Sequence, residues 1–381
     1  MITEIRGVQF ENKGAELMLY AVVQQLKEWD EKNVVAMRAK VGSYSQRAQA
    51  GVSQLLWSDK TFPIIGSSPN LALNLIPQKT KDRLGLVTYS QIDAVLDASG
   101  FNYSDQWGLE KTNTMLDLAV RCKKAGKKVI FLPQAFGPFK DPAIRKSFSK
   151  VLSYSDLIFA RDDISYKYLI DIGGDSSKIK MSPDFTNLLK GIPPENLPQD
   201  IHKRVCVIPN IRMTDKTSDK VSGAYFHFLE SSIKITRAKG LNPLIVVHET
   251  CDIELAKALQ NRFDPSLEII IEKNPLRLKG LIGKSYAVIG SRFHGLINAL
   301  SQGVPCVATA WSHKYHMLMK DYDCFECLLT DVDVDNEIEQ KINIVTDESL
   351  RDELVKKIQT SSLKQKDAAR SMWGEVKNLL Y

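Results

Sequence analysis

The feature that most constrains the fold is an alternation of short apolar runs with helical patterns along nearly the whole chain. In the first half, this pattern predicts strands near residues 2–9, 33–38, 93–98, 128–134, 156–160 and 178–182, with helices near 14–29, 107–125, 142–154 and 163–172. Strands that alternate with helices are typical of parallel sheets covered by helices on both faces. We therefore predict an α/β protein.

The length and a break in the pattern predict two domains. The chain has 381 residues, more than the roughly 250 to 300 residues at which a single core usually stops growing. A polar, proline-rich stretch over 191–200 is typical of a linker, and the alternation then restarts, with strands near 204–209, 243–248, 267–271, 286–290 and 305–309. We predict Rossmann-like domains over 1–190 and 201–360, and a C-terminal helix over 361–381 that packs back on the first domain.

The region 42–88 interrupts the alternation in the first domain and is interpreted as an insertion. Its apolar segments, such as 62–66 and 71–77, are far shorter than the roughly 20 residues that span a bilayer. Two alternatives remain for it: a packed subdomain, or a flap that faces the membrane surface or a substrate.

Composition excludes some classes of function. The net charge is +6, and no block of five or more Lys or Arg residues indicates a nucleic-acid-binding arm. An anionic small substrate and an anionic membrane surface both fit this charge. The first residues lack a signal-peptide pattern, so we expect a cytoplasmic protein, with the inner face of the membrane as an alternative location. Cys324 and Cys327 have no second pair at metal-ligand spacing, and we expect neither a metal nor a cofactor.

The strongest local pattern is Ser291-Arg292-Phe293-His294-Gly295, where a buried strand runs into a helix. Ligands of doubly wound sheets bind at the carboxyl ends of the strands. A helix start attracts anions, the Arg292 guanidinium can bind a phosphate or carboxylate bidentately, and His294 can exchange a proton near neutral pH. We hypothesise that His294 is a general acid or base. The alternative is that Arg292 and His294 only brace the helix.

Other polar residues also follow predicted strands and are candidates for the same crevice. Each of them has a structural alternative, as a helix cap or an ordinary surface residue. They are Lys314 after strand 305–309, Arg212 after strand 204–209, Asn12, Gly14 and Glu16 after the first strand, and His248 with Glu249 after strand 243–248.

Several of these segments together form a pattern that is specific to one protein family. The tandem of Ser291–Gly295 with Gly303-Val304-Pro305 and a turn containing Lys314 resembles the C-terminal signature of the polysaccharide pyruvyl transferase family. The resemblance covers nearly the whole chain, because it includes Asn12-Lys13-Gly14-Ala15-Glu16, Leu132–Pro138, Ala160-Arg161-Asp162-Asp163 with Ser165, and Ser182-Pro183-Asp184.

The resemblance implies both a fold and a reaction. Members have two Rossmann-like domains facing across a cleft, as in GT-B glycosyltransferases, and characterised members transfer the enolpyruvyl unit of phosphoenolpyruvate to a sugar as a ketal. It implies that His294 is catalytic, that Arg292 and the Phe293 backbone bind the donor, and that Arg212 is a second donor-binding arginine. Phosphoenolpyruvate would be a co-substrate, and the acceptor would be a saccharide, either free or lipid-linked.

Two departures from the family pattern concern the first domain, where the acceptor would bind. Ala15 stands where the family usually has an acidic residue, and Asp97–Phe101 replaces an expected glycine-rich turn. Two rival functions therefore remain. A glycosyltransferase that uses a sugar nucleotide would need an acidic pair or a ribose-binding carboxylate after a second-domain strand, for which Glu249 is a candidate. A noncatalytic sugar-binding protein would have little need for Arg292 and His294 together.

Overall fold

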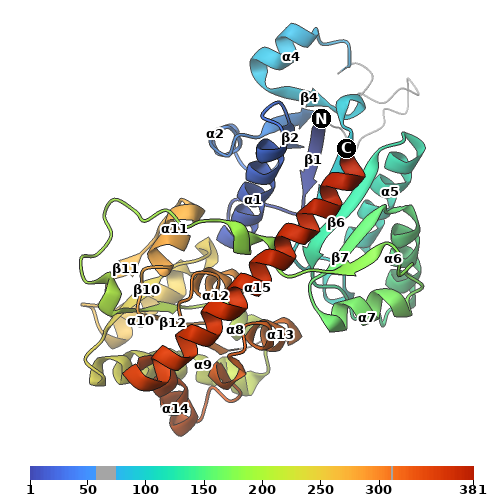
Figure 1. Ribbon diagram of the computed structural model, residues 1–381. Coiled ribbons are helices and arrows are strands. Elements are labelled where there is room, and N and C mark those ends of the chain that lie inside the picture. The colour runs from blue at the N-terminus through green and yellow to red at the C-terminus, as the bar shows by residue number, and fades with distance from the viewer. Residues whose placement is uncertain (57–73, 310–311) are drawn as a thin grey trace. The chain divides into compact units, whose positions relative to one another are not determined.

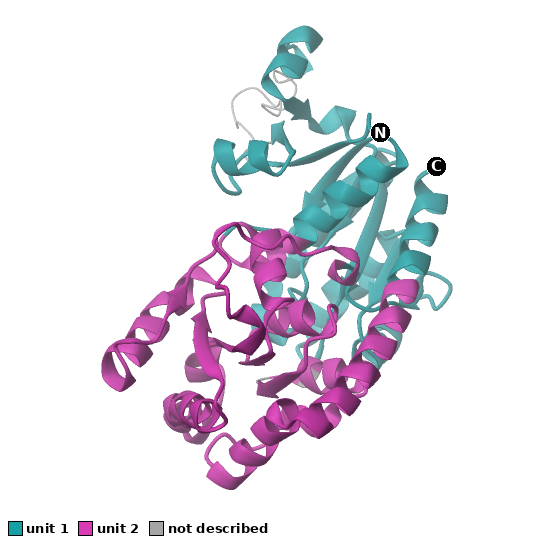
Figure 2. Ribbon diagram, turned by 60° about the vertical axis from the view of Figure 1, so that its left-hand side comes forward, with its two compact units in different colours: residues 1–10, 18–185, 369–381 teal, residues 11–17, 186–368 magenta. Residues whose placement is uncertain are grey.

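A computed structural model describes residues 1–56, 74–309 and 312–381 of the protein. The described chain divides into two compact units, coloured separately in Figure 2. Unit 1 comprises residues 1–10, 18–185 and 369–381, and unit 2 comprises residues 11–17 and 186–368. The predicted linker, 191–200, lies within unit 2, and so does the short segment 11–17 that follows the first strand.

Unit 1 is built on an eight-stranded parallel sheet in the order β4-β3-β2-β1-β5-β6-β7-β8 (Figure 1). The strands are β1 (Ile2–Arg6), β2 (Val34–Arg38), β3 (Ser53–Leu56), β4 (Leu86–Thr88), β5 (Ala94–Asp97), β6 (Lys128–Gln134), β7 (Leu157–Ala160) and β8 (Ile179–Met181). The helices are α1 (Lys13–Trp29), α2 (Tyr44–Gln49), α4 (Gln78–Leu84), α5 (Leu109–Lys124), α6 (Pro142–Tyr154) and α7 (Asp163–Asp171).

The region 42–88 corrects the sequence analysis, because it does not stand apart from the sheet. It contributes β3 and β4, which pair in parallel with β2 and with each other. These strands have only four and three residues, and strands so short at a sheet edge carry no long apolar run. Of its apolar segments, 62–66 lies wholly and 71–77 partly outside the described residues.

The end of the last helix packs on unit 1. The helix α15 (Glu348–Leu380) ends with residues that belong to this unit. The ring of Trp373 lies edge-on to Trp29 at 5.7 Å and to Phe185 at 5.6 Å between centroids. The side chain of Asn33 also donates a hydrogen bond of 2.6 Å to the Tyr381 hydroxyl. The apolar residues at the end of the helix are therefore buried on this unit, whereas Leu354 and Ile358 belong to the core of unit 2.

Unit 2 is built on a six-stranded parallel sheet in the order β11-β10-β9-β12-β13-β14. Its strands are β9 (Arg204–Ile208), β10 (Asn242–Val246), β11 (Ile269–Ile270), β12 (Ala287–Gly290), β13 (Cys306–Thr309) and β14 (Leu328–Leu329). Its helices are α8 (Arg212–Asp215), α9 (Asp219–Ala238), α10 (Ile253–Phe263), α11 (Pro275–Ile282), α12 (Phe293–Leu300), α13 (His313–Asp321), α14 (Asp335–Thr346) and most of α15.

The order of these strands explains where a ligand site can form. In unit 2 the chain moves outward from β9 to β10 on one side and from β12 to β13 on the other. In unit 1 the same reversal occurs between β1 and β5. At such a reversal the loops leave in opposite directions and open a crevice at the carboxyl ends of the strands. The residues of β12 and β13 are all buried, as their continuous apolar runs predicted.

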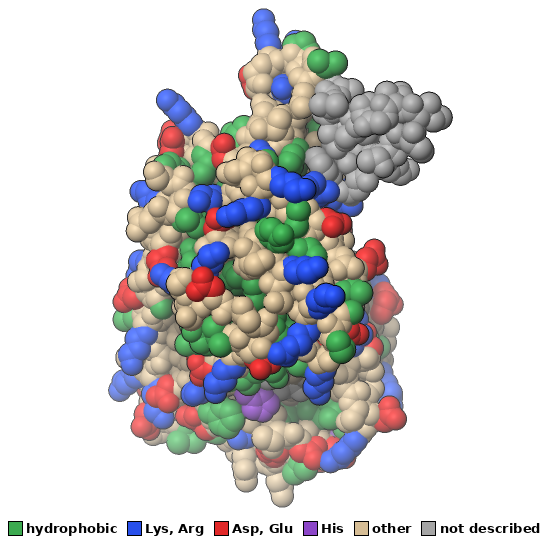
Figure 3. Space-filling model, turned by 90° about the vertical axis from the view of Figure 1, so that its right-hand side faces the viewer, with side chains coloured by type: hydrophobic (Ala, Val, Ile, Leu, Met, Phe, Trp, Pro, Cys, Tyr) green, Lys and Arg blue, Asp and Glu red, His purple; other side chains and the backbone are tan. Residues whose placement is uncertain are grey.

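The surface is mixed in charge. Basic and acidic side chains are interspersed on the face drawn in Figure 3, with hydrophobic side chains between them. None of the helices in the described part of the chain is long and apolar enough to cross a membrane.

Candidate functional site

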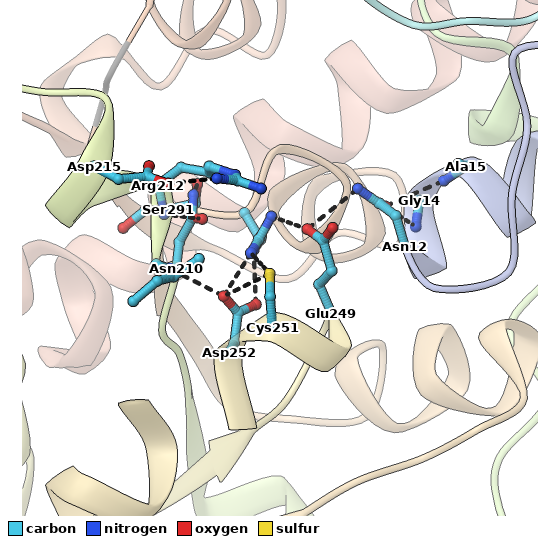
Figure 4. Close-up of polar contacts among 12 residues, drawn as sticks. Asn12, Gly14, Ala15, Asn210, Arg212, Asp215, Glu249, Cys251, Asp252 and Ser291 are labelled. Atoms are coloured by element: carbon cyan, nitrogen blue, oxygen red, sulfur yellow. Dashed lines mark hydrogen bonds and ion pairs between the residues drawn. The ribbon is translucent and has the colours of Figure 1, made fainter. Parts of the chain in front are cut away.

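Polar side chains gather at the carboxyl ends of three neighbouring strands of unit 2 (Figure 4). The loop after β9 carries Asn210 and Arg212, the loop after β10 carries His248, Glu249 and Asp252, and the turn after β12 carries Ser291 and Arg292. The residues 11–17, which also belong to unit 2, lie against this group. The structure thus brings together candidates from four separate parts of the sequence.

Arg292 is the centre of an ionic cluster. Its Nε donates a hydrogen bond of 2.8 Å to Oδ2 of Asp252, and its Nη2 contacts the other oxygen of the same carboxylate. Its Nη1 contacts Glu249, and Nη2 lies 3.2 Å from the sulfur of Cys251. Burial opposes the positive charge, but these carboxylates outweigh it and raise the pKa of Arg292. Arg292 is therefore charged and held in a fixed orientation.

Asp252 is the functional residue that sequence reasoning missed. Its side chain is completely buried and holds Arg292 bidentately, while Oδ1 also accepts a hydrogen bond of 2.9 Å from the backbone of Ile211. The available signal was an acidic residue a few positions after the predicted strand 243–248. Glu249, Cys251 and Asp252 could together hold a metal ion, but the Arg292 guanidinium contacts all three, so a positive charge already occupies that position.

A second network beneath the cluster fixes the turn between β12 and α12. The Ser291 hydroxyl lies 2.6 Å from the hydroxyl of Thr309 and 2.9 Å from that of Tyr225. The Ser291 carbonyl accepts hydrogen bonds from Tyr315, at 2.7 Å, and from Asn210, at 2.6 Å. Because these groups are buried, their hydrogen bonds are costly to break. They hold the start of α12 and the residues on it in one conformation.

His294 lies on the first turn of α12 and packs against the start of α1. A Cβ atom built on Gly14 would lie 2.2 Å from Nδ1 of His294 and 2.7 Å from its Cβ. Only a glycine therefore allows this approach. The Asn12 side chain caps the same turn, since its Oδ1 accepts hydrogen bonds from the backbone N–H groups of Gly14 and Ala15.

Substitution of Gly14 by alanine is expected to displace the His294 imidazole. We expect the turnover number of the reaction that the sequence analysis predicts to fall at least about tenfold, because misplacing a reacting group by an ångström costs about that much or more. The control is Gly223→Ala on α9, where an added Cβ meets no atom within 4 Å, and which should preserve activity. Equal activity of Gly14→Ala and the parent would contradict a positioning role for Gly14.

His248 is the second histidine of the site and is buried. Its Nε2 atom is buried and has no hydrogen-bond partner among the described residues. Burial holds the pKa of His248 well below its usual range, and the neighbouring charges of His294, Arg292 and Lys13 lower it further. His248 is therefore neutral near pH 7.

This lowered pKa predicts a pH-dependent stability. In the unfolded chain His248 takes up a proton as the pH falls below about 6.5, whereas the folded protein keeps it neutral. The unfolded state then binds more protons, so the free energy of unfolding falls as the pH falls below that value. His248→Gln should lose this contribution, and the difference between the two proteins should change by up to about 1.4 kcal/mol per pH unit in urea titrations between pH 7 and 5. Parallel curves would contradict the prediction.

The segment 11–17 contacts the ionic cluster as well as His294. Asn12 forms an isolated antiparallel bridge with Glu249, and its Nδ2 donates to Oε2 of Glu249 at 3.3 Å. Burial raises the pKa of Glu249, and the Arg292 charge opposes that shift. Glu16 points elsewhere, because its carboxylate pairs with Lys13 at 2.6 Å. Asn12 and Gly14 thus belong to the site, whereas Glu16 supports the helix start.

The remaining predicted donor residues surround the start of α12. Arg212 is partly exposed and pairs with Asp215. The Lys314 ammonium lies 5.2 Å from the centre of the Phe293 ring and 5.5 Å from that of Tyr315, distances that suit a cation–π interaction. Arg212 and Lys314 add two cations near Arg292, while Asp215, Glu249 and Asp252 supply three carboxylates among the same contacts.

Arg161 and Asp162, which belong to the family pattern, form an internal ion pair and a helix cap. Arg161 pairs with Asp184 at 3.2 Å in the interior of unit 1, and Asp162 accepts a hydrogen bond of 2.7 Å from the backbone of Ser165 at the start of α7. Two segments of the family pattern in unit 1 therefore have a structural role.

The fold of the chain is that of two-domain Rossmann-like proteins, the class of GT-B glycosyltransferases and sugar-nucleotide epimerases. Similar solved structures include a glycosyltransferase from Rickettsia africae (TM-score 0.61, 12% identity, 100% of this chain and 97% of that chain). HepE from Anabaena in complex with UDP has a TM-score of 0.60 and 12% identity, and covers 100% and 99%. UDP-GlcNAc 2-epimerase from Neisseria meningitidis bound to UDP-GlcNAc has a TM-score of 0.59 and 12% identity, and covers 100% of both chains.

Within this class, a family model identifies the chain more narrowly. The model of the polysaccharide pyruvyl transferases matches residues 12–313, which include Asn12, Arg212, Glu249, Arg292 and His294. The chain therefore belongs to the polysaccharide pyruvyl transferase family. No curated protein matches the sequence.

Proposed function

We propose that the protein transfers the enolpyruvyl unit of phosphoenolpyruvate to two hydroxyls of a saccharide, forming a cyclic ketal and releasing phosphate. The observation that carries the proposal is the arrangement at the carboxyl ends of β9, β10 and β12. It combines a fixed guanidinium, two further cations, His294 on the first turn of α12 and His248 in the loop after β10. Membership of the pyruvyl transferase family supports the same reaction.

The donor carries a carboxylate and a phosphate, and the site offers cations for both. Arg212 and Lys314 lie at the edges of the crevice and bind the anionic groups, while the backbone N–H groups at the start of α12 add hydrogen bonds. Arg292 is already paired with Asp252. This ion pair keeps the plane of the Arg292 guanidinium and its Nη1 atom in place. The donor replaces Glu249 as the partner of Nη1, since Glu249 is the less buried of the two carboxylates.

The reaction needs proton transfer, and the position of His294 on the first turn of α12, next to Arg292, supports a role for it in this transfer. Protonation of the donor methylene carbon leaves a positive, oxocarbenium-like carbon that a sugar hydroxyl attacks as it loses its proton. The C–O bond to phosphate then breaks, and the neighbouring hydroxyl closes the ketal and loses its own proton. His294 donates or accepts one of these protons. His248 is neutral and stays beneath His294, where an added charge would be unfavourable.

The acceptor is a saccharide with suitably placed hydroxyls, either free or attached to a lipid carrier. A lipid-linked acceptor would bring the protein to the inner face of the membrane. No metal or other cofactor takes part in the proposed steps. The acceptor sugar and the ketal position are best found by incubating the protein with phosphoenolpyruvate and galactose, mannose, glucose and N-acetylhexosamine acceptors, followed by mass spectrometry of the products.

Transfer from a sugar nucleotide is the rival reaction, because proteins of similar fold have been solved with UDP and UDP-sugars. Such an enzyme needs a carboxylate for the ribose hydroxyls. Glu249 and Asp252 both follow β10, but both contact Arg292, so the acidic pair is engaged within the protein.

Thermal-shift titrations of the whole protein with phosphoenolpyruvate and with UDP- and GDP-sugars separate the two functions. We expect phosphoenolpyruvate to raise the melting temperature. The Arg212→Gln variant should need about tenfold more phosphoenolpyruvate for the same rise, because it loses one charge-assisted contact. The control is Arg277→Gln, an exposed arginine on α11 that pairs with Glu195. Stabilisation by sugar nucleotides alone would refute the pyruvyl transfer proposal.

A further inference from the structure

A separate pocket lies in unit 1, at the reversal of strand order in its own sheet. It has a volume of about 460 Å³, within the range of about 300 to 1,000 Å³ that is usual for small-molecule sites. Its walls are the carboxyl ends of β1 and β2 with the loops that follow them, and one face of α5. The position is the one where doubly wound sheets bind ligands.

Basic side chains dominate the lining of this pocket. Arg6, Arg38, Lys40 and Arg121 line it, whereas Glu110 and Asp117 are its acidic residues. Two of the arginines are at the ends of strands whose three central residues are buried. Cations at these strand ends favour an anionic ligand that enters from the carboxyl edge of the sheet.

A buried carboxylate beneath the pocket holds the two strand-end arginines together. Glu4 is almost fully buried, and its Oε1 lies 3.5 Å from Arg6 and 3.5 Å from Arg38. One carboxylate thus serves two guanidinium groups at distances longer than a good hydrogen bond. Burial raises the pKa of Glu4, and both arginines oppose the shift. The trio retains positive charge even when Glu4 is ionised.

One donor of this trio is unsatisfied. Nη1 of Arg6 is buried and makes no hydrogen bond within the described residues, and Oε1 of Glu4 likewise accepts none there. A buried polar atom without a hydrogen bond is costly. An anionic oxygen in the pocket would supply the acceptor that Arg6 lacks.

The opposite wall can bind hydroxyl groups. Glu110, Thr114, Asp117 and Arg121 line the pocket at spacings that place them on one face of α5. Carboxylates and a threonine hydroxyl accept hydrogen bonds from sugar hydroxyls. The pocket therefore combines an anion-binding floor with a wall suited to a sugar.

We propose that this pocket binds a saccharide through a phosphate or diphosphate ester, with the ester at Arg6, Arg38 and Lys40 and the sugar along α5. The assignment of the bound molecule as the acceptor rests on the proposed pyruvyl transfer. The binding itself does not, because it can be measured without phosphoenolpyruvate and without turnover.

Isothermal titration of the full-length protein tests the proposal with three probes: inorganic pyrophosphate, glucose 1-phosphate and glucose. We expect both phosphate compounds to bind and glucose to bind at least about tenfold more weakly, since it lacks the charge-assisted contacts. Lys40→Gln and Arg121→Gln should each weaken the phosphate compounds about tenfold. If glucose 1-phosphate binds more tightly than pyrophosphate after correction for charge, the sugar contributes contacts and lies on α5. Thr114→Val should then remove this preference.

Glu4→Gln gives the sharpest test, because its effect has the opposite sign. Removal of the buried carboxylate frees Arg6 and Arg38 for the ligand, and binding should become several-fold tighter. A merely structural role for Glu4 would leave affinity unchanged or lower it. If this variant does not fold, Lys40→Gln still decides, because Lys40 is exposed. The matched control is Lys124→Gln, an exposed lysine of α5 outside the pocket lining.

Arg212→Gln distinguishes this pocket from the site in unit 2. It should leave the binding of glucose 1-phosphate intact while it weakens phosphoenolpyruvate. Failure of the parent to bind either phosphate compound, or weakening by Arg212→Gln but not by Lys40→Gln and Arg121→Gln, would overturn the pocket assignment. If the phosphate compounds bind with the expected variant pattern while unit 2 binds only sugar nucleotides, the result would support the pocket assignment. It would refute only the proposal of pyruvyl transfer.

Discussion

Replacement of His294 by glutamine is expected to lower the rate of pyruvate transfer by about 10² to 10⁴-fold, the usual contribution of a general acid or base. Glutamine keeps a similar size and polarity but cannot exchange a proton at neutral pH. The melting temperature should change little, because His294 lies at the start of α12 and is only partly buried. The measurement is the release of phosphate from phosphoenolpyruvate in the presence of an acceptor.

The matched control for this experiment is His227→Gln on α9. His227 lies on an exposed surface of unit 2, where it hydrogen-bonds to Asp335 at 2.8 Å, so the change should preserve activity. His294→Ala should be as inactive as His294→Gln if the imidazole transfers a proton. Activity of both variants close to that of the parent would remove His294 from the mechanism.

Asp252→Leu is expected to lower the free energy of unfolding by about 3 to 5 kcal/mol. It leaves the buried Arg292 charge without its bidentate partner, and a broken buried ion pair usually costs that much. Glu249 still contacts Arg292, which favours the lower end of the range. Urea denaturation checks the prediction, and Asp335→Ala, which removes an exposed ion pair, should cost no more than about 1 kcal/mol.

A double variant shows whether the cost arises from the unpaired charge. Asp252→Leu combined with Arg292→Met should recover more than half of the lost stability, because apolar residues can replace a buried ion pair at little cost. Both proteins should be inactive. If Asp252→Leu alone costs less than about 1 kcal/mol, or if Arg292→Met restores nothing, Asp252 does not hold Arg292 in the folded protein.

The sequence alone predicted the elements whose signal is local. Long apolar runs bounded by turns identified β5, β6, β12 and β13, and clear helical periods identified α5 and α15, because burial on both faces demands continuous apolar residues. The sequence analysis did not predict β3 and β4, the last two strands on one side of the sheet, because strands of three or four residues carry no such run. Position after a strand also identified Arg292 and His294, because the polar residues of a doubly wound domain gather at the carboxyl ends of its strands.

The tertiary structure decided which residues from distant segments contact one another. Nothing in the local sequence of Asp252 indicates that it holds Arg292, forty positions later, or that Gly14 must lack a side chain because His294 packs against it. Nor does the sequence of β1 show that Glu4 lies between Arg6 and Arg38. The periodicity of a sequence encodes which face of an element is buried, and so it determined the fold class and the strand ends that carry the candidate site. Which side chains meet there depends on strand order and register, which arise only when all the strands pack together.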